Sequence, residues 1–285
     1  MRGLSYRIKY LTSIILAIAA LTAVKAQTPN DMDNSTNQGD VKVLLKTTLG
    51  DITILLYGDT PRHRDNFVKL VKEGNYDGVL FHRVINDFMV QTGDPDSKDA
   101  PKGKMLGGGD VPYQLDAEFL FPTHYHHRGA IAAARQGDNV NPQKKSSGSQ
   151  FYIVTGKKFT PGQLDNMERQ ALMRHKQEVF DSLASQHRDS IMSLRRNRDQ
   201  AGLQALQEQL VAETEKLTAG DSVIYTPEMR ETYINEGGTP HLDGSYTVFG
   251  RVISGMDVVD KIQKAETDGN DRPLEDIRII SATIL

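Results

Sequence analysis

Short apolar runs separated by glycine-containing turns extend over most of the chain and constrain its fold more than any other feature. Each run has the length of one strand, and several alternate β-branched with polar residues. A helix is predicted to begin at Pro61 after the cap residue Thr60, and a second helix is predicted over residues 255–265. Many short strands with two helices predict a mainly β fold, a closed antiparallel barrel. The runs are "VKVLLKTT", "ITILLY", "VLFHRVI", "FMVQTGD", "GAIAAAR", "SQFYIVTG", "YTVFGRVISG" and "IRIISATIL".

One long segment has a different pattern and predicts helices. Residues 163–219 contain no proline and a single glycine, Gly202, and most of them are good helix formers with apolar residues at helical spacing. Two antiparallel helices with a turn near residues 197–202 are expected. A third short helix should begin at Pro227 with Thr226 as its cap. The predicted barrel is therefore interrupted by an inserted α-helical subdomain, residues 163–239.

The N-terminus has the pattern of an export signal. Basic residues in "MRGLSYRIKY" precede an apolar run over residues 11–24 and the sequence "VKAQ", which predicts a signal peptide of residues 1–26 cleaved after Ala26. A retained membrane anchor is the alternative, but a spanning helix needs roughly 20 apolar residues. The polar residues 27–39 are predicted to be a disordered linker. We expect an exported protein located in the periplasm, with secretion or envelope association as alternatives.

Composition and charge exclude several functional classes. The chain has no cysteine, so it can form neither a disulfide nor a thiolate nucleophile. Loss of residues 1–26 removes four basic residues and no acidic ones, which changes the formal net charge from −3 to −7. An acidic surface argues against a nucleic-acid partner.

The stretch "FHRVINDFMVQTGD", residues 81–94, contains the first candidate site. Arg83 lies between apolar residues of a predicted strand. An arginine in this position either faces solvent or is held in place for a functional role. His82 is expected on the opposite face as a structural residue. The next strand presents Gln91 beside Phe88 and Met89. An arginine and a glutamine beside large apolar side chains predict an apolar pocket with a few directed polar groups.

Two later stretches contribute to the same kind of surface. In "GSQFYIVTG", Gln150 and Tyr152 share one face of a predicted strand. In "PHLDGSYTVFG", a turn presents Leu242 and Tyr246.

Four of these motifs together resemble the cyclophilin-type peptidyl-prolyl cis/trans isomerases. They are "FHRVINDFMVQTGD", "GAIAAAR", "GSQFYIVTG" and "LDGSYTVFGRVISGMDVVDKI", and they occur in the order of that family. The resemblance covers about residues 40–160 and 241–285. It implies a closed eight-stranded antiparallel barrel capped by two helices, with its two parts at residues 40–162 and 240–285. It further implies an isomerase without cofactor or metal that acts on proline-containing polypeptide clients.

The family's site residues carry over to matching positions. The resemblance implies a catalytic role for Arg83, Gln91 and Phe88. It implies that substrate is bound by Met89, Ala134, Arg135, Gln150, Tyr152, Leu242 and Tyr246. Phenylalanine is the more usual residue at the position of Tyr152. His241 replaces a frequent tryptophan and Tyr246 a histidine, and both changes bear on affinity for the cyclic-peptide inhibitor cyclosporin.

The residue types fit a rotation. The barrier to turning an X–Pro bond is about 18–20 kcal/mol and comes from amide resonance, so no nucleophile or metal is needed. A group that favours a pyramidal nitrogen, and a dry pocket that holds the ring, would be enough. A charge-assisted hydrogen bond contributes about 1.5–3 kcal/mol, and a ten-thousand-fold acceleration needs about 5.4 kcal/mol. Two such interactions, strengthened in the transition state, would supply it.

Other interpretations remain open. His124, His126 and His127 could hold zinc, although no carboxylate or cysteine completes a known spacing. "SSGSQ" lacks the pattern of a serine nucleophile, and the run Gly107–Gly109 lacks the strand–helix context of a phosphate site. From another class, the chain could be a folding factor that holds unfolded or proline-containing chains through the helical insertion, with isomerisation secondary. The insertion could also be a bundle that packs only on itself.

Overall fold

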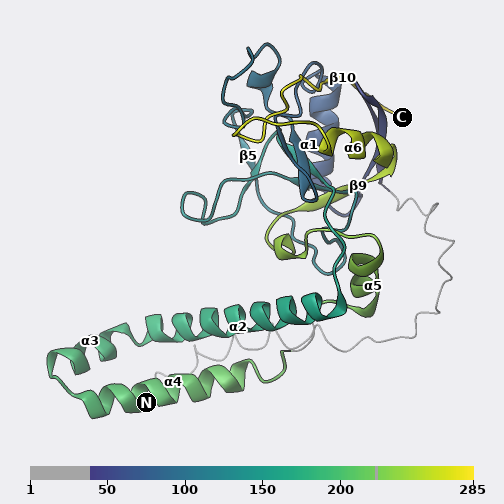
Figure 1. Ribbon diagram of the computed structural model, residues 1–285. Helices are drawn as coiled ribbons and strands as arrows, with labels where there is room; N and C mark the ends of the chain where they lie inside the picture. Colours follow the sequence, from purple (N-terminus) through teal and green to yellow (C-terminus); the bar gives the residue numbers. More distant parts are fainter. Residues whose placement is uncertain (1–38, 222–223) are drawn as a thin grey trace. The chain divides into compact units, whose positions relative to one another are not determined.

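The computed structural model describes residues 39–221 and 224–285 (Figure 1). The predicted signal peptide and residues 27–38 of the predicted linker lie outside the described residues. Within the described part of the chain, the membrane-spanning criterion of length and apolar character is met by no helix.

Eight antiparallel strands form the main sheet in the order β10-β1-β2-β9-β6-β8-β4-β3. The predicted strands "VKVLLKTT" and "ITILLY" are present and form a hairpin, because β1 pairs with β2 along its whole length around a turn at Thr48 and Leu49. A separate pair is formed by β5 (Gln114–Leu115) and β7 (Ser146–Ser147). The strands of the main sheet are β1 (Val41–Thr47), β2 (Gly50–Leu56), β3 (Arg83–Ile85), β4 (Met89–Thr92), β6 (Ala130–Ala133), β8 (Phe151–Val154), β9 (Val248–Ser254) and β10 (Ile279–Ile284).

The expectation of a closed barrel is wrong, because the sheet is an open, strongly curled half-barrel. Strands β3 and β10 are its two edges, and no ladder joins them among the described residues. β3 has only three residues, too few to pair along β10. The residues before β3 instead make single backbone hydrogen bonds across the opening, from Gly78 N to Ile279 O at 2.8 Å and from Phe81 N to Ile277 O at 2.9 Å.

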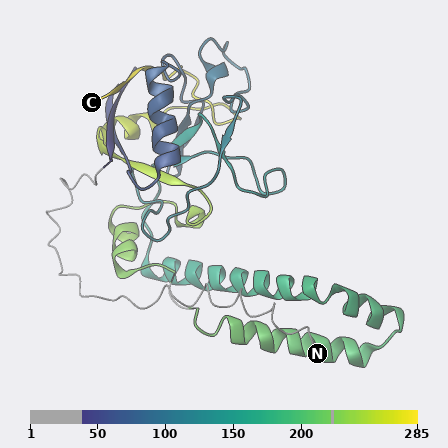
Figure 2. The same ribbon diagram turned by 180° about the vertical axis from the view of Figure 1, so that it is seen from behind.

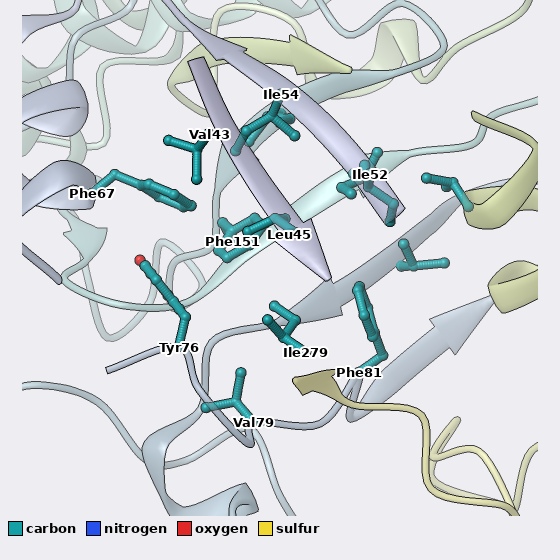
Figure 3. Packing of buried hydrophobic residues seen from close by; sticks show 14 of the residues in the cluster. Val43, Leu45, Ile52, Ile54, Phe67, Tyr76, Val79, Phe81, Phe151 and Ile279 are labelled. Carbon is teal, nitrogen blue, oxygen red and sulfur yellow. The ribbon is translucent and has the colours of Figure 1, made fainter. Parts of the chain in front are cut away.

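Two helices pack against the sheet and complete the main core. Helix α1 (Pro61–Lys72) contributes Phe67 and α6 (Met256–Gln263) contributes Val259, and both side chains are buried. Figure 3 shows how side chains from β1 and β2 meet Phe67, Tyr76 and Phe151. These three rings pack pairwise at centroid distances of 4.6, 5.1 and 5.5 Å. Burial of each large apolar side chain stabilises the fold by about 1.5–3 kcal/mol.

Four helices make up the predicted insertion, and the first of them begins at Pro161, two residues before the predicted start. They are α2 (Pro161–Gln186), α3 (Arg188–Arg196), α4 (Gln200–Leu217) and α5 (Pro227–Asn235). The first predicted helix is in fact two, because the chain leaves helical geometry at His187, so the expectation of a single helix there is wrong. α2 and α4 run side by side in both views (Figures 1 and 2). They bury only a narrow seam that includes Leu183 and Leu210, and most of their other side chains are exposed.

α5 is bound to the sheet region by close backbone contacts. The predicted cap is confirmed, since Thr226 accepts a hydrogen bond from Met229 N at 3.2 Å. After α5, Gly238 N donates to Lys157 O at 3.1 Å and Thr239 N donates to His126 O at 2.8 Å. The chain therefore enters and leaves the helical segment side by side, at residues 157 and 238.

Candidate functional site

Nine of the ten predicted site residues line one cavity of about 100 Å³. The tenth, Gln150, lines a neighbouring cavity of about 560 Å³ that shares Gln91, Ala134 and Arg135 with the first. The structure thus brings together residues that are up to 163 positions apart in the chain, while their individual roles stay predictions. The smaller cavity is lined by Arg83, Phe88, Met89, Gln91, Ala134, Arg135, Tyr152, Leu242 and Tyr246, and we call it the proline pocket.

Strand register explains why the central residues meet. Arg83 on β3 is the direct partner of Gln91 on β4, and Gln91 is the direct partner of Tyr152 on β8. Side chains of directly paired residues lie on the same face, with Cβ atoms about 4.5–5.5 Å apart. The three side chains therefore form one row across three strands.

The floor of the pocket is a second apolar cluster, separate from the main core. Tyr152 lies on the opposite face of β8 from Phe151, which belongs to the main core. Tyr152 packs with the buried Met89 and Val248, while Phe88 and Leu242 are only partly buried against them. The curled sheet thus has one face for the core and one for the pocket.

A chain of polar contacts begins at Arg83. Its guanidinium lies 3.5 Å from Gln91 Oε1 and 3.6 Å from Asp271 Oδ2, both long contacts, and its side chain is 43 % exposed. Gln91 Nε2 donates to Gln150 Oε1 at 2.9 Å, and Gln150 Nε2 donates to Gly109 O at 2.6 Å. Since a guanidinium has five N–H donors, Arg83 retains donors that can reach a ligand in the pocket.

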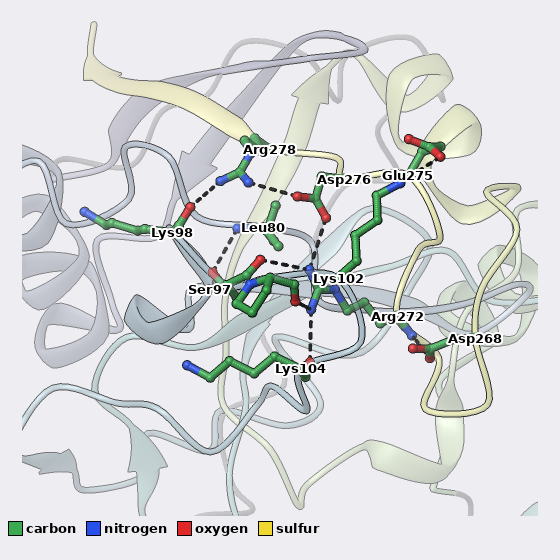
Figure 4. Close-up of polar contacts among 12 residues, drawn as sticks. Leu80, Ser97, Lys98, Lys102, Lys104, Asp268, Arg272, Glu275, Asp276 and Arg278 are labelled. Carbon is green, nitrogen blue, oxygen red and sulfur yellow. Dashed lines mark hydrogen bonds and ion pairs between the residues drawn. The ribbon is translucent and has the colours of Figure 1, made fainter.

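The glycine run at residues 107–109 is part of the scaffold of this site. The carboxylate of the buried Asp94 accepts hydrogen bonds from Gly107 N at 2.6 Å and Gly109 N at 3.4 Å. A Cβ on Gly109 would lie 2.2 Å from Asp94 Oδ1, so any larger residue there would displace the Asp94 carboxylate. A second buried residue, Arg272, holds the chain before this glycine run. It donates to Pro101 O and Lys104 O at 3.0 Å each (Figure 4).

Sequence reasoning missed Asp94, Asp271 and Arg272. Asp94 is the last residue of the recognised motif, and the sequence contains no signal that it binds the glycine run 13 residues later. Asp271 and Arg272 lie about 190 residues from Arg83 in a turn without a distinctive pattern. Asp271 has a positive φ of 63° and its carbonyl accepts Val84 N at 2.8 Å, which places its carboxylate beside Arg83.

His82 is the one site neighbour whose orientation was predicted incorrectly. It lines a cavity of about 280 Å³ together with Arg83, rather than facing away from it. The strand begins only at Arg83, so strand alternation does not apply to residue 82. His82 is 3 % exposed, neither ring nitrogen has a hydrogen-bond partner among the described residues, and burial lowers its pKa to about 4.

The buried His82 predicts a pH dependence of stability. Its pKa is about 4 in the folded state against about 6.5 in an unfolded chain, so the unfolded state binds more protons between these values. The free energy of unfolding should therefore fall by about 3 kcal/mol from this residue as the pH decreases from 6.5 to 4. Urea unfolding at several pH values measures it. The His82→Asn variant should show a shallower decrease, and equal slopes for both proteins would contradict the prediction.

The three clustered histidines contact separate partners. His124 Nε2 lies 2.8 Å from Asp59 Oδ1, and His127 Nδ1 lies 2.7 Å from the carbonyl of Arg128. His126 contacts other residues with both ring nitrogens. Among residues 39–221 and 224–285, no group of three or more His, Asp or Glu side chains is arranged to hold a metal ion.

Two of the departures from the family pattern, His241 and Tyr246, lie at the rim of the pocket. His241 stacks on Phe88 with ring centroids 5.6 Å apart, and burial lowers its pKa. Arg135 lies over the ring of Tyr246 at 4.4 Å and donates from Nε to Ser245 O at 2.9 Å. A cation over an aromatic ring is attracted to its face, so Tyr246 helps hold Arg135 along the pocket edge.

Comparison with known proteins gives consistent matches. The family model described as cyclophilin type peptidyl-prolyl cis-trans isomerase/CLD matches residues 42–190 and 229–284. A protein of Staphylococcus aureus (strain COL) named as a peptidyl-prolyl cis-trans isomerase is 30% identical over 255 residues, which are 89% of this chain and 96% of that protein. A Streptococcus pyogenes protein named as a bifunctional phosphatase/peptidyl-prolyl cis-trans isomerase is 30% identical over 252 residues, which are 87% of this chain and 39% of that protein. A crystal structure of a Cryptosporidium parvum cyclophilin type isomerase aligns with a TM-score of 0.49 and 19% identity, over 86% of this chain and 98% of that one.

Proposed function

Because this chain belongs to the cyclophilin-type peptidyl-prolyl cis-trans isomerase family, whose members act on proline-containing peptides, we propose that it turns Xaa-Pro bonds in the proline pocket with Arg83 as its catalytic cation. One observation carries the proposal. Nine residues expected to serve that reaction line a single small cavity, with Arg83, Gln91 and Tyr152 in one row across β3, β4 and β8.

The apolar floor positions the substrate. Phe88, Met89 and Tyr152 offer three large side chains against which a proline ring is held out of water. The ring stays in place while the residue before it rotates. A site that excludes water also strengthens every polar contact made within it.

Arg83 stabilises the twisted amide. In the transition state the prolyl nitrogen loses conjugation and becomes pyramidal, with a localised lone pair. Arg83 donates to the prolyl carbonyl and to that lone pair, which is absent from the planar ground state. An interaction that strengthens only in the transition state raises kcat rather than merely tightening binding. No covalent bond forms or breaks, so this chemistry requires no general base or nucleophile.

The amide chain holds the peptide backbone. Gln91 and Gln150 are hydrogen-bonded to each other and to the loop at Gly109, so their side chains are fixed before substrate arrives. Fixed polar groups lose little rotamer entropy when they bind. Ala134 and Arg135, next along the groove, complete the surface on which the peptide lies.

A binding experiment tests the pocket assignment. A short peptide with a central proline should shift the NMR signals of Met89, Ala134 and Leu242, and the same peptide with alanine in place of proline should not. Equal shifts for both peptides would mean that the cavity does not recognise the proline ring.

We further propose that the clients are exported proteins, which rests on the signal-like residues 1–26. The N-terminal sequence of the mature protein, with cell fractionation, tests this. A mature chain that begins at Gln27 in the periplasmic fraction supports it. A chain that keeps residues 1–26 in the cytoplasm would contradict it.

The helical hairpin α2–α4 offers a further surface for clients in this proposal. It exposes Met173 (72%), Met192 (49%) and Leu217 (59%), side chains that adapt to varied apolar partners. Replacing the three by glutamine should weaken the suppression of aggregation of an unfolded client while peptide isomerisation is unchanged. Undiminished suppression would exclude the hairpin as a client surface.

A further inference from the structure

A buried chain of hydrogen bonds runs from the floor of the proline pocket to the helical insertion. The hydroxyl of Tyr152 lies 3.0 Å from His126 Nε2, and His126 Nδ1 lies 2.9 Å from Asp243 Oδ1. The hydroxyl of Tyr233 donates to Asp243 Oδ2 at 2.6 Å. Tyr152 is on β8, His126 precedes β6, Asp243 follows the 3-10 turn η2 (Pro240–Leu242), and Tyr233 is on α5.

The donors and acceptors along this chain of hydrogen bonds can be assigned. Asp243 is an acceptor, and it also accepts the backbone N–H of His126 at 2.8 Å. The ring of His126 therefore donates from Nδ1, so in the neutral ring Nε2 accepts the proton of the Tyr152 hydroxyl. This hydroxyl points to His126, which does not line the pocket, whereas Tyr152 itself does.

All four groups are shielded from water. Tyr152 is 4 % exposed, and His126 and Tyr233 are fully buried. The side chain of Asp243 is 4 % exposed. Buried polar groups in a connected network depend on one another, because a group that loses its partner finds no water to replace it.

Tyr233 itself is firmly placed. Its ring packs against Tyr125 and Tyr225 at 5.6 and 5.7 Å, and its carbonyl accepts Phe159 N at 3.0 Å. A Cβ on Gly238 would lie 2.6 Å from the Tyr233 ring and 2.3 Å from His126 O. α5 and the segment that bears His126 are therefore in direct contact.

We propose that Tyr233 is a positioning residue of the proline pocket, acting through Asp243 and His126 on Tyr152. The inference rests on the proposed function of that pocket and adds that α5, within the insertion, supports the active site. The insertion thus has two parts with different roles. α5 is needed for the pocket geometry. The hairpin α2–α4 packs Leu164 in the same buried cluster as Tyr233, but among the described residues it donates no hydrogen bond to this chain and accepts none.

Two matched variants separate this role from general packing. Tyr233→Phe removes one hydroxyl and keeps the ring. Tyr225→Phe is the control, since Tyr225 is also buried in the same cluster but its hydroxyl donates to Pro240 O at 3.3 Å, outside the chain. Tyr233→Phe should lower kcat/KM for an Xaa-Pro peptide roughly tenfold, a change of about 1.36 kcal/mol in the transition-state free energy. Tyr225→Phe should leave it unchanged.

A double-mutant cycle tests the route of the effect. In a Tyr152→Phe background the hydroxyl that joins the pocket to His126 is missing, so the hydrogen-bond chain no longer reaches the pocket. Tyr233→Phe should then cause no further loss of activity. A purely structural role would give the same loss in both backgrounds. Either that result, or wild-type activity of a folded Tyr233→Phe protein, would overturn the proposal.

A readout without catalysis keeps this proposal distinct from the proposed function. The NMR signals of the Met89 and Leu242 methyl groups should move on Tyr233→Phe and stay in place on Tyr225→Phe. An inactive wild type that shows this pattern would refute the isomerase mechanism and leave the positioning role standing. Unmoved signals would refute the positioning role whatever the activity. If Tyr233→Phe does not fold, Asp243→Asn, which removes the charge and replaces one of the two carboxylate acceptors by an amide donor, should move the same signals.

Discussion

Replacement of Arg83 by alanine is expected to lower kcat/KM for an Xaa-Pro peptide by about 10²–10⁴-fold. The estimate follows from two charge-assisted interactions of about 1.5–3 kcal/mol each that strengthen in the transition state. Because the planar ground state makes them weakly, most of the loss should appear in kcat and little in KM. Steady-state kinetics over a range of peptide concentrations measure both parameters. The highest concentration must stay below that at which the peptide aggregates.

The Arg83 variants carry their own controls. Arg83→Lys keeps the charge but loses the planar fork that reaches Gln91 and Asp271, so it should retain activity between the alanine variant and the wild type. The Arg83 side chain is 43 % exposed, and exposed ion pairs contribute only about 0–1 kcal/mol, so both variants should remain folded. An alanine variant with more than half of the wild-type kcat would exclude Arg83 as the catalytic cation.

Gly93→Ala is expected to cause a large loss of stability, about 2–5 kcal/mol, from left-handed strain and overpacking together. Gly93 has φ of +93°, and a Cβ there would lie 2.3 Å from Ser149 O and 2.9 Å from Gln150 Cα. These are main-chain atoms, so the neighbouring strand must shift, and Gln150 must shift with it away from Gln91. Urea unfolding gives the stability, and the NMR signal of the Gln150 side-chain amide reports the displacement.

Gly103→Ala separates the two causes. Gly103 has a similar φ of +81°, but a Cβ there would have no atom within 4 Å. This variant should lose only about 1–2 kcal/mol, the cost of the left-handed backbone. Equal losses in the two variants would show that the close approach at Gly93 contributes nothing.

The strands and helices could be predicted where local pattern decides. The β1–β2 hairpin, α6 and the capped start of α5 follow from alternation, spacing and Thr-Pro signals, and all are present. The closure of the barrel could not be predicted, because it depends on whether two edges far apart in sequence pair along their length. β3 is too short for this pairing, and a three-residue strand has no alternation to reveal it.

The residues that line the pocket could be predicted from the sequence motifs. The residues that hold them in place could not. The resemblance named the ten residues, and the strand register then accounts for the row Arg83–Gln91–Tyr152. Asp271 contacts Arg83 across about 190 residues, and Tyr233 reaches the pocket only through the contact between His126 and Asp243, which are 117 residues apart. A single sequence contains no signal for such contacts. Tyrosine in place of the usual phenylalanine at residue 152 was noted, but its hydroxyl acquires a meaning only beside His126.

Exchange NMR on a proline-containing tetrapeptide tests the central claim most directly. Uncatalysed cis–trans exchange takes tens to hundreds of seconds, whereas a catalytic amount of the mature protein should produce exchange cross peaks between cis and trans signals at mixing times of about 1 s. The Arg83→Ala protein at the same concentration should produce none. Absence of cross peaks with the folded wild-type protein would contradict the account.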